Sequence, residues 1–170
     1  MKHEYLLWVA TLAYGVHMLE ETIYNWHDWV RKVLKLNAEW SEFYMVNAVV
    51  IVLGATCAMV GWRNPAFALI LPAFMLVNAV LFHIVPVLVT RIFSPGVITA
   101  VLLFLPVTGW IYYQADRDGV LTGSAIAISS LLGLVLMLFP IVLQKTKTNA
   151  MVSRYLIKPA ETTREPDAAT

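Results

Sequence analysis

The sequence predicts an all-α membrane protein, a bundle of five transmembrane helices, on two observations. Hydrophobic residues make up 59% of the 170 residues and charged residues only 14%, against about 45–50% and about 25% in soluble domains. Lys and Arg fall in clusters that leave five long intervals without a basic residue, each able to supply the roughly 20 apolar residues that cross a bilayer. A net charge of +1 gives no reason to expect nucleic acid as a partner.

The intervals between the clusters place the five helices along the chain. Short polar or Pro/Gly turns separate the later ones, namely "GWRNPA", "RIFSPG" and "QADRDG". We expect one membrane domain over residues 1–145, followed by a polar tail over 146–170 that is disordered at its end. The expected spans are about 4–26, 42–62, 66–90, 96–114 and 122–144.

The basic residues also predict the orientation. Five spans put the two termini on opposite sides of the membrane, and the basic residues are unequally divided between those sides. The N-terminal side carries Lys2, Arg63 and Arg117, and the other carries Arg31, Lys32, Lys35, Arg91, Lys145, Lys147 and the rest of the tail. The positive-inside rule then predicts an outside N-terminus and a cytoplasmic C-terminus, and we expect the inner (plasma) membrane of a bacterium.

The longest connection, "NWHDWVRKVLKLNAEWSEF", is predicted to be an interfacial helix rather than an ordinary loop. Trp26, Trp29, Val30, Val33 and Trp40 recur at near-helical spacing, with basic residues between them. That pattern is typical of a helix lying on the cytoplasmic leaflet. Such a helix serves either as an anchor or as a lid over a cavity that opens toward that leaflet.

Polar residues are rare inside the predicted spans, and they share one depth. Each ionised carboxylate there costs about 2.5–3.5 kcal/mol on insertion scales. In "YGVHMLEETIY", helix geometry puts Tyr14, His17, Glu20, Glu21 and Tyr24 on one face. We compare the depths of these residues in the membrane with the helical rise of about 1.5 Å per residue. One slab of the cytoplasmic half then contains His17, Glu20, Glu21, Asn47, Asn78 and His83. Because such residues usually face the bundle interior and pair with each other, we infer one buried polar site.

Pro86 is expected to distort the third span beside His83. It cannot donate a hydrogen bond to the carbonyl of Phe82. Asn78 and His83 are five residues apart, which on a regular helix would point them about 140° from each other. A kink or π-bulge near Pro86 would bring both side chains inward.

Three ordered motifs resemble those of the HXXEE-domain family, small prokaryotic and fungal membrane proteins of about this size. They are "HMLEE" (17–21), "NAVLFH" (78–83) and "FSPG" (93–96), and the resemblance extends to about residue 145. The chain has one more residue between Asn78 and His83 than the family motif, and Phe93 replaces a tyrosine, so Phe93 is expected to be a packing residue. The resemblance implies a membrane-embedded enzyme but supplies no substrate.

The first functional hypothesis is a metal-dependent enzyme. Two imidazoles with one or two carboxylates match catalytic zinc sites and the 2-His-1-carboxylate iron site. His17, Glu21 and His83 would be ligands, and Glu20 a further ligand or the general base. Asn78 would orient the ligands, and Asn47, Asn78, Tyr14 and Tyr24 are candidates for contacts around the ligands or to the substrate. The substrate would be small and apolar or amphipathic, like a lipid or isoprenoid, because it partitions from the bilayer.

Three alternatives remain open at this point. Metal-free acid–base catalysis by Glu20, Glu21 and His17 would suit an isomerase or cyclase, with Tyr14 and Tyr24 stabilising a carbocation. The same residues could bind or pass a metal ion or a proton without catalysis, or form a network that only fixes helix packing. The single cysteine, Cys57, excludes an internal disulfide and a metal cluster built on cysteines. A chain of this size is also compatible with a homodimer.

Overall fold

The computed structural model describes residues 3–147, with side chains as far as residue 142, and every regular element in that part of the chain is a helix. The predicted all-α class is therefore confirmed, while the predicted tail lies outside the described residues from residue 148 onward. The elements are α1 (Leu6–Ile23), α2 (Trp26–Lys32), α3 (Trp40–Val60), η1 (Gly61–Arg63), α4 (Pro65–Ala68), α5 (Ile70–Val77), η2 (Asn78–Ile84), α6 (Val85–Thr90), α7 (Val97–Thr99), η3 (Ala100–Phe104), α8 (Leu105–Arg117) and α9 (Gly123–Lys147).

Four helical segments of the described chain are long and apolar enough to cross a membrane, which indicates an integral membrane protein. They are Trp40–Arg63, Pro65–Thr90, Val97–Arg117 and Gly123–Val142, and they correspond to the second to fifth expected spans. Helix α1 is not among them, because its 18 residues include a histidine and two glutamates. That α1 also crosses the bilayer stays a prediction, as does the orientation of the chain.

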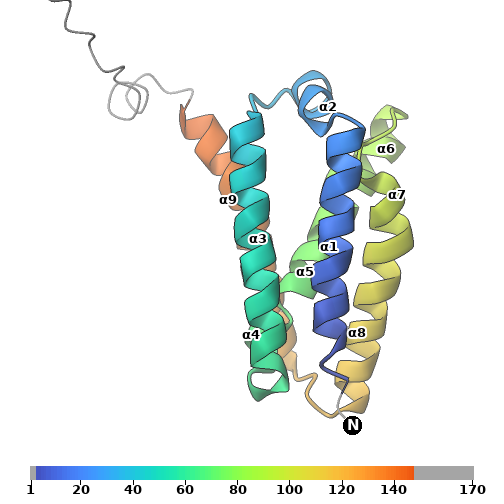
Figure 1. Cartoon of the computed structure of the whole chain (residues 1–170), viewed down its shortest axis with the longest axis vertical. Coiled ribbons are helices and arrows are strands. Elements are labelled where there is room, and N and C mark those ends of the chain that lie inside the picture. Colours follow the sequence, from blue (N-terminus) through green and yellow to red (C-terminus); the bar gives the residue numbers. More distant parts are fainter. Residues whose placement is uncertain (1–2, 148–170) are drawn as a thin grey trace, which may run out of the picture.

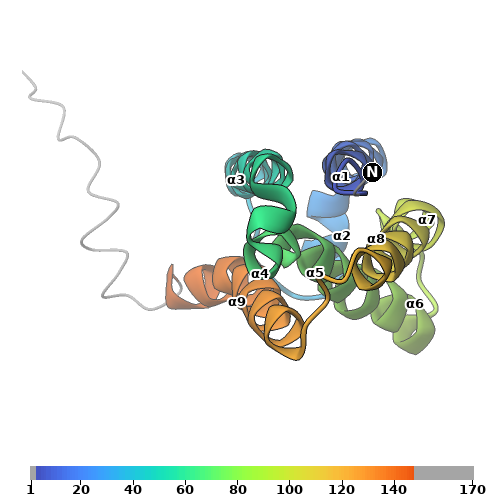
Figure 2. The ribbon, with the colours of Figure 1, turned by 90° about the horizontal axis from the view of Figure 1, so that it is seen from below.

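The third expected span occupies the centre of the bundle. Within its most apolar window 61% of residues are buried, against 17–33% in the other three membrane-length helices. Viewed along the bundle, α5 lies in the middle, with α1, α3, α8 and α9 around it (Figure 2). Helix α9 packs closely on it at Gly133, where an added Cβ would lie 2.7 Å from the backbone nitrogen of Phe74. The central position explains why all of residues 70–75 are buried.

Hydrogen bonds between helix ends hold the bundle together at the end where the N-terminus lies, opposite α2 (Figure 1). The Asp118 carboxylate accepts hydrogen bonds from the backbone N–H of His3 at 2.7 Å and from the indole Nε1 of Trp62 at 3.0 Å. Glu4 Oε2 accepts from the backbone N–H of Trp62 at 3.0 Å. The hydrogen bond from the His3 backbone is the main reason that the pKa of Asp118 lies below its usual value. These bonds join the start of α1 to the ends of α3 and α8.

A short helix stands where the interfacial helix is predicted. Helix α2 lies across the end of the bundle away from the N-terminus (Figure 1). Asn25, at φ 56°, begins it, and its side chain accepts from the backbone N–H of Asp28 at 3.4 Å. Trp29 and Val30 are buried against Ala38, so the apolar face of α2 turns toward the protein. Its placement at a leaflet surface stays a prediction.

The predicted distortion of the third span is confirmed as a π-helix. The segment η2 covers Asn78–Ile84 and runs directly into Pro86. A π-turn hydrogen-bonds from residue i to i+5, so residues five apart share a face. Asn78 and His83 are accordingly both buried, at 7% and 0% exposure. A second π-helix, η3, precedes Pro106 in the same way and packs against η2.

Candidate metal centre

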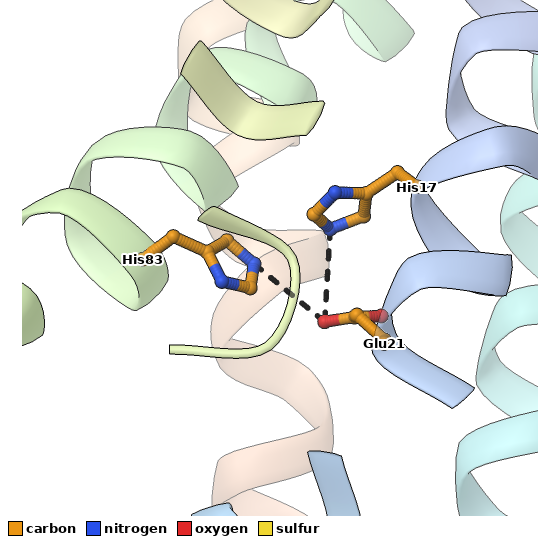
Figure 3. A group of neighbouring side chains, drawn as sticks. All are labelled: His17, Glu21 and His83. Carbon is orange, nitrogen blue, oxygen red and sulfur yellow. Dashed lines mark ion pairs between the residues drawn. The ribbon is translucent and has the colours of Figure 1, made fainter. Parts of the chain in front are cut away.

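Three side chains from α1 and η2 meet in the interior of the bundle (Figure 3). The Nε2 atoms of His17 and His83 lie 3.6 Å and 3.5 Å from the same atom, Oε1 of Glu21. One possible ligand atom from each residue lies within 4.8 Å of the other two. All three residues are buried: His17 is 1% exposed, His83 0% and Glu21 5%. We call His17, Glu21 and His83 the three-residue site.

Hydrogen bonds fix the tautomer of His17. Its Nδ1 lies 2.8 Å from Oγ1 of Thr99. The single hydroxyl proton of Thr99 is directed to Oε2 of Glu20, or else to the carbonyl of Gly96. Since both of those oxygens accept, the Thr99 oxygen must accept from His17 Nδ1–H. In the neutral imidazole the proton is therefore on Nδ1, and the lone pair of Nε2 is directed toward Glu21.

His83 is held in the same way by a different hydroxyl. Its Nδ1 lies 3.1 Å from Oγ of Ser94, and that hydroxyl donates to the backbone carbonyl of Phe82 at 3.5 Å. In a regular α-helix the carbonyl of Phe82 would pair with the N–H of residue 86, which Pro86 lacks. Ser94 therefore accepts from His83 Nδ1–H, which leaves the Nε2 lone pair free. Neither Nε2 atom of the two histidines has a hydrogen-bond partner in this buried place.

Glu20 lies beside the three-residue site but uses its carboxylate elsewhere. Oε1 accepts from the backbone N–H groups of Gly96 at 3.0 Å and Ile98 at 3.1 Å, and Oε2 accepts from that of Thr99 at 2.7 Å. These are the unpaired N–H groups at the start of the membrane-length helix Val97–Arg117. The positive end of that helix offsets the carboxylate's charge. With both oxygens occupied, Glu20 does not take the predicted position of a further ligand.

A Pro-Gly turn brings these partners to the histidines. Val97 N–H donates to the carbonyl of Ser94 at 3.0 Å, so residues 94–97 form a turn with Pro95 and Gly96 at its centre. Gly96 has φ 98° and ψ −11°, the conformation that a type II turn requires of its third residue. An added Cβ at Gly96 would lie 2.6 Å from Cε1 of His83 and 2.7 Å from Cε1 of His17. The Gly96 backbone thus closes one side of the three-residue site.

Aromatic rings close another side. The His17 ring lies 4.3 Å from the fully buried ring of Phe104 and 4.8 Å from that of His83, centroid to centroid. Tyr14 stacks on Phe104 at 6.0 Å, and its hydroxyl donates to Oδ1 of Asn47 at 2.6 Å. Asn47 in turn donates from Nδ2 to the carbonyl of Phe43 at 2.8 Å. Tyr14 and Asn47 are thus linked beside the histidines, and both also line the cavity described below; their predicted contact with a substrate stays a prediction.

The other two predicted contact residues differ in position. Asn78 is buried, and its Nδ2 donates to Sδ of Met137 at 3.7 Å, whereas its Oδ1 has no partner. Tyr24 lies just beyond the end of α1, is 51% exposed and packs its ring against Phe93 at 5.3 Å. Tyr24 is thus directed away from the three-residue site, because the face it was assigned to ends when α1 ends.

A cavity of about 90 Å³ adjoins the site, and Glu21 lies in its wall. Helices α1, α2, α3, α5 and α9 and the π-helix η2 all contribute to the lining. The side chains are mostly apolar and include Trp26 and Val30 of α2. That α2 acts as a lid over this cavity stays a prediction.

Sequence reasoning missed Ser94 and Thr99, the hydroxyls that hold the two histidines. They lie 11 and 82 residues along the chain from the imidazoles they contact. No spacing rule connects residues so far apart. The available signal was weak: two hydroxyl residues flank a Pro-Gly pair at the start of an apolar helix.

The support from Thr99 can be tested by replacing it with valine, which keeps the shape and removes the hydroxyl. We expect Thr99→Val to weaken zinc binding by about 10–100-fold, as loss of a ligand's hydrogen-bond partner typically does. Zinc affinity would be measured by competition with a chelating dye in detergent. Thr108→Val is the matched control, because Thr108 is buried and donates only within its own helix, to the carbonyls of Phe104 and Leu105. Equal zinc affinity in the two variants would contradict the role of Thr99.

Comparison with known proteins finds one family. The model of a family described as "protein of unknown function with HXXEE motif" matches residues 8–111. No curated protein and no solved structure matches the chain. The matched range contains the three-residue site, the carboxylate of Glu20 and both hydroxyls that hold the histidines.

Proposed function

The chain belongs to the HXXEE-motif family of unknown function, and we propose, from its own side chains, that it is a membrane-embedded, metal-dependent enzyme. Its substrate would be a small amphipathic or apolar molecule that enters from the bilayer. The proposal rests on one observation: two buried Nε2 lone pairs without partners converge on one oxygen of Glu21.

A divalent metal ion fits these residues. Buried polar atoms without a partner are rare and cost about 1–3 kcal/mol each, and here two occur side by side. Both imidazoles are held as the tautomer that ligates through Nε2, and each gives its other nitrogen to a hydroxyl, as metal-bound histidines do. Two histidines and one carboxylate are the ligands of catalytic zinc in several enzymes and of non-haem iron. A metal ion would also neutralise the carboxylate of Glu21 in the apolar interior.

Catalysis is supported by the number and placement of the ligands. Three protein ligands leave coordination positions for water or substrate, whereas structural zinc sites use four. A metal ion there would supply a Lewis acid or a reactive bound water. Glu21 belongs to the three-residue site and also lines the cavity. A molecule in the cavity would therefore lie next to the metal ligands. Glu20 would contribute by holding the Gly96 turn and Thr99 in place.

Elemental analysis of the detergent-purified protein tests the proposal. We expect close to one zinc or iron per chain in the wild type and at least about a tenfold loss in His17→Ala, Glu21→Ala and His83→Ala. His27→Ala is the matched control, because His27 belongs to α2 and contacts Asp28 and Arg31.

Absence of metal from the wild type, even after incubation with zinc and with ferrous iron, would overturn the metal proposal. The alternative it would favour is acid–base chemistry by Glu21 with His17 and His83. The Nε2 atoms of both histidines already lie within 3.6 Å of Oε1 of Glu21. Loss of metal in the His27→Ala control as well would contradict the assignment of the ligands.

A further inference from the structure

We propose that the cavity beside Glu21 binds a single-chain amphiphile whose head is not anionic and donates a hydrogen bond, a long-chain alcohol or amine, with Oδ1 of Asn78 as the acceptor. This names the substrate class of the proposed function and rests on it for its place in catalysis. The binding itself depends only on Asn78 and the cavity.

The amide of Asn78 is the first line of support. Its side chain is 7% exposed and lines the cavity. The Nδ2 group donates to the thioether of Met137 at 3.7 Å, and because a thioether can only accept, this contact sets which way the amide points. Oδ1 is left buried without a partner. The free atom is thus an acceptor, and its natural partner is a ligand that donates.

The charges of the cavity wall exclude an acidic head. The carboxylates of Glu21 and Glu42 are in the wall, and no Lys or Arg is among the described residues that line it. A phosphate or carboxylate head would therefore find no cationic side chain in the described wall to pair with, and would lie near two carboxylates. Asn47 does not change this balance, because both ends of its amide are already hydrogen-bonded, to Tyr14 and to Phe43. A hydroxyl or an amine suits the same wall.

The remaining wall suits one hydrocarbon chain. Phe43 and Val46 of α3 and Leu136 and Ile141 of α9 all line the cavity. Both helices also expose apolar side chains outward, such as Met45 and Val49 on α3 and Phe139 on α9, as expected of surfaces in contact with lipid. A volume of about 90 Å³ is well below the roughly 300–1,000 Å³ of cavities for drug-sized ligands. It would hold a head and the first part of one chain, with the rest extending between α3 and α9 into the bilayer.

Photolabelling with a decanol that carries a diazirine on its chain tests the inference. The purified protein, in lipid nanodiscs, would be labelled before and after removal of metal, and the adducts mapped by mass spectrometry. We expect adducts on cavity residues such as Phe43, Val46 and Met137. Unlabelled decanol or decylamine should suppress them at least about tenfold at concentrations where decyl methyl ether and decanoate do not, which corresponds to one hydrogen bond of about 1.4 kcal/mol. The more potent of the two competitors identifies the head as alcohol or amine.

The variant Asn78→Leu should lose about tenfold in labelling, while Thr108→Val, buried outside the cavity, should keep it. The competitor series on the wild type decides the question even if Asn78→Leu does not fold. Adducts spread over lipid-facing residues such as Phe139, or equal suppression by decanol and its methyl ether, would overturn the inference. Specific labelling of a protein that takes up neither zinc nor ferrous iron would support the inference and overturn the metal proposal. A metal-loaded protein without cavity adducts would do the reverse.

Discussion

Replacing Gly96 by alanine is expected to abolish metal binding and to destabilise the protein by roughly 2–5 kcal/mol, the sum of backbone strain and overpacking. The new methyl group would lie 2.6 Å from Cε1 of His83 and 2.7 Å from Cε1 of His17. Neither ring can retreat freely, because the Nδ1 atom of His83 is tied to Ser94 in the turn and that of His17 to Thr99 just after it. The value of φ at Gly96, 98°, is also unfavourable for alanine. Metal content and thermal unfolding in detergent would both be measured.

Gly15→Ala is the matched control for this change. Gly15 lies inside α1, two residues before His17, and an added Cβ there meets nothing within 4 Å. Alanine is the better helix former by about 1 kcal/mol, so this variant should bind metal normally and be at least as stable as the wild type. Normal metal content in Gly96→Ala would refute the close packing of the turn on the two histidines.

The substitution Glu20→Ala is expected to destabilise the protein by about 3–5 kcal/mol, the cost typical of removing one partner of a buried charged network. It leaves the backbone N–H groups of Gly96, Ile98 and Thr99 without acceptors at the start of a membrane-length helix. Metal affinity should fall as well, because Thr99 loses the carboxylate that directs its hydroxyl proton away from His17. Thermal unfolding and zinc affinity of the variant would be compared with the wild type.

Asp116→Ala provides the control, since Asp116 is an exposed acidic residue at the end of α8. Substitutions at exposed positions usually change stability by less than about 0.5 kcal/mol, and zinc affinity should not change. If Glu20→Ala were as stable as Asp116→Ala, the carboxylate would not be what holds the Gly96 turn.

These two glutamates are neighbours in sequence, yet they have different surroundings. Glu21 points one oxygen at two imidazole nitrogens and borders the cavity. Glu20 points both oxygens at the start of another helix. Consecutive helix residues are about 100° apart around the axis, so the two side chains meet different neighbours. The cost of two carboxylates in an apolar helix is thereby offset in two ways: for Glu20 by backbone N–H groups, and for Glu21, in our proposal, by a metal ion.

Much of the site could be predicted from the sequence because intramembrane polar residues are few. With two histidines and two glutamates in the interior of the predicted spans, away from their ends, comparison of depth was enough to group His17, Glu21 and His83. The π-helix could be anticipated as well, since the five-residue separation of Asn78 and His83 conflicts with a regular helix and Pro86 stands next to them. Tyr24 could not be placed correctly, because helical spacing carries no information about where α1 ends.

By itself, the sequence determined the helical class, the membrane-length helices and the depth at which the polar residues gather, because hydropathy and helical period are local properties of the chain. Only the tertiary structure decided which glutamate faces the histidines, which hydroxyls hold their tautomers and that Gly96 packs on both rings. It also decided that Oδ1 of Asn78 is left free toward a cavity. These features depend on contacts of α1 and η2 with the turn over 94–97, with α7 and with α9. The position of one helix against another is not encoded in the spacing of residues along either.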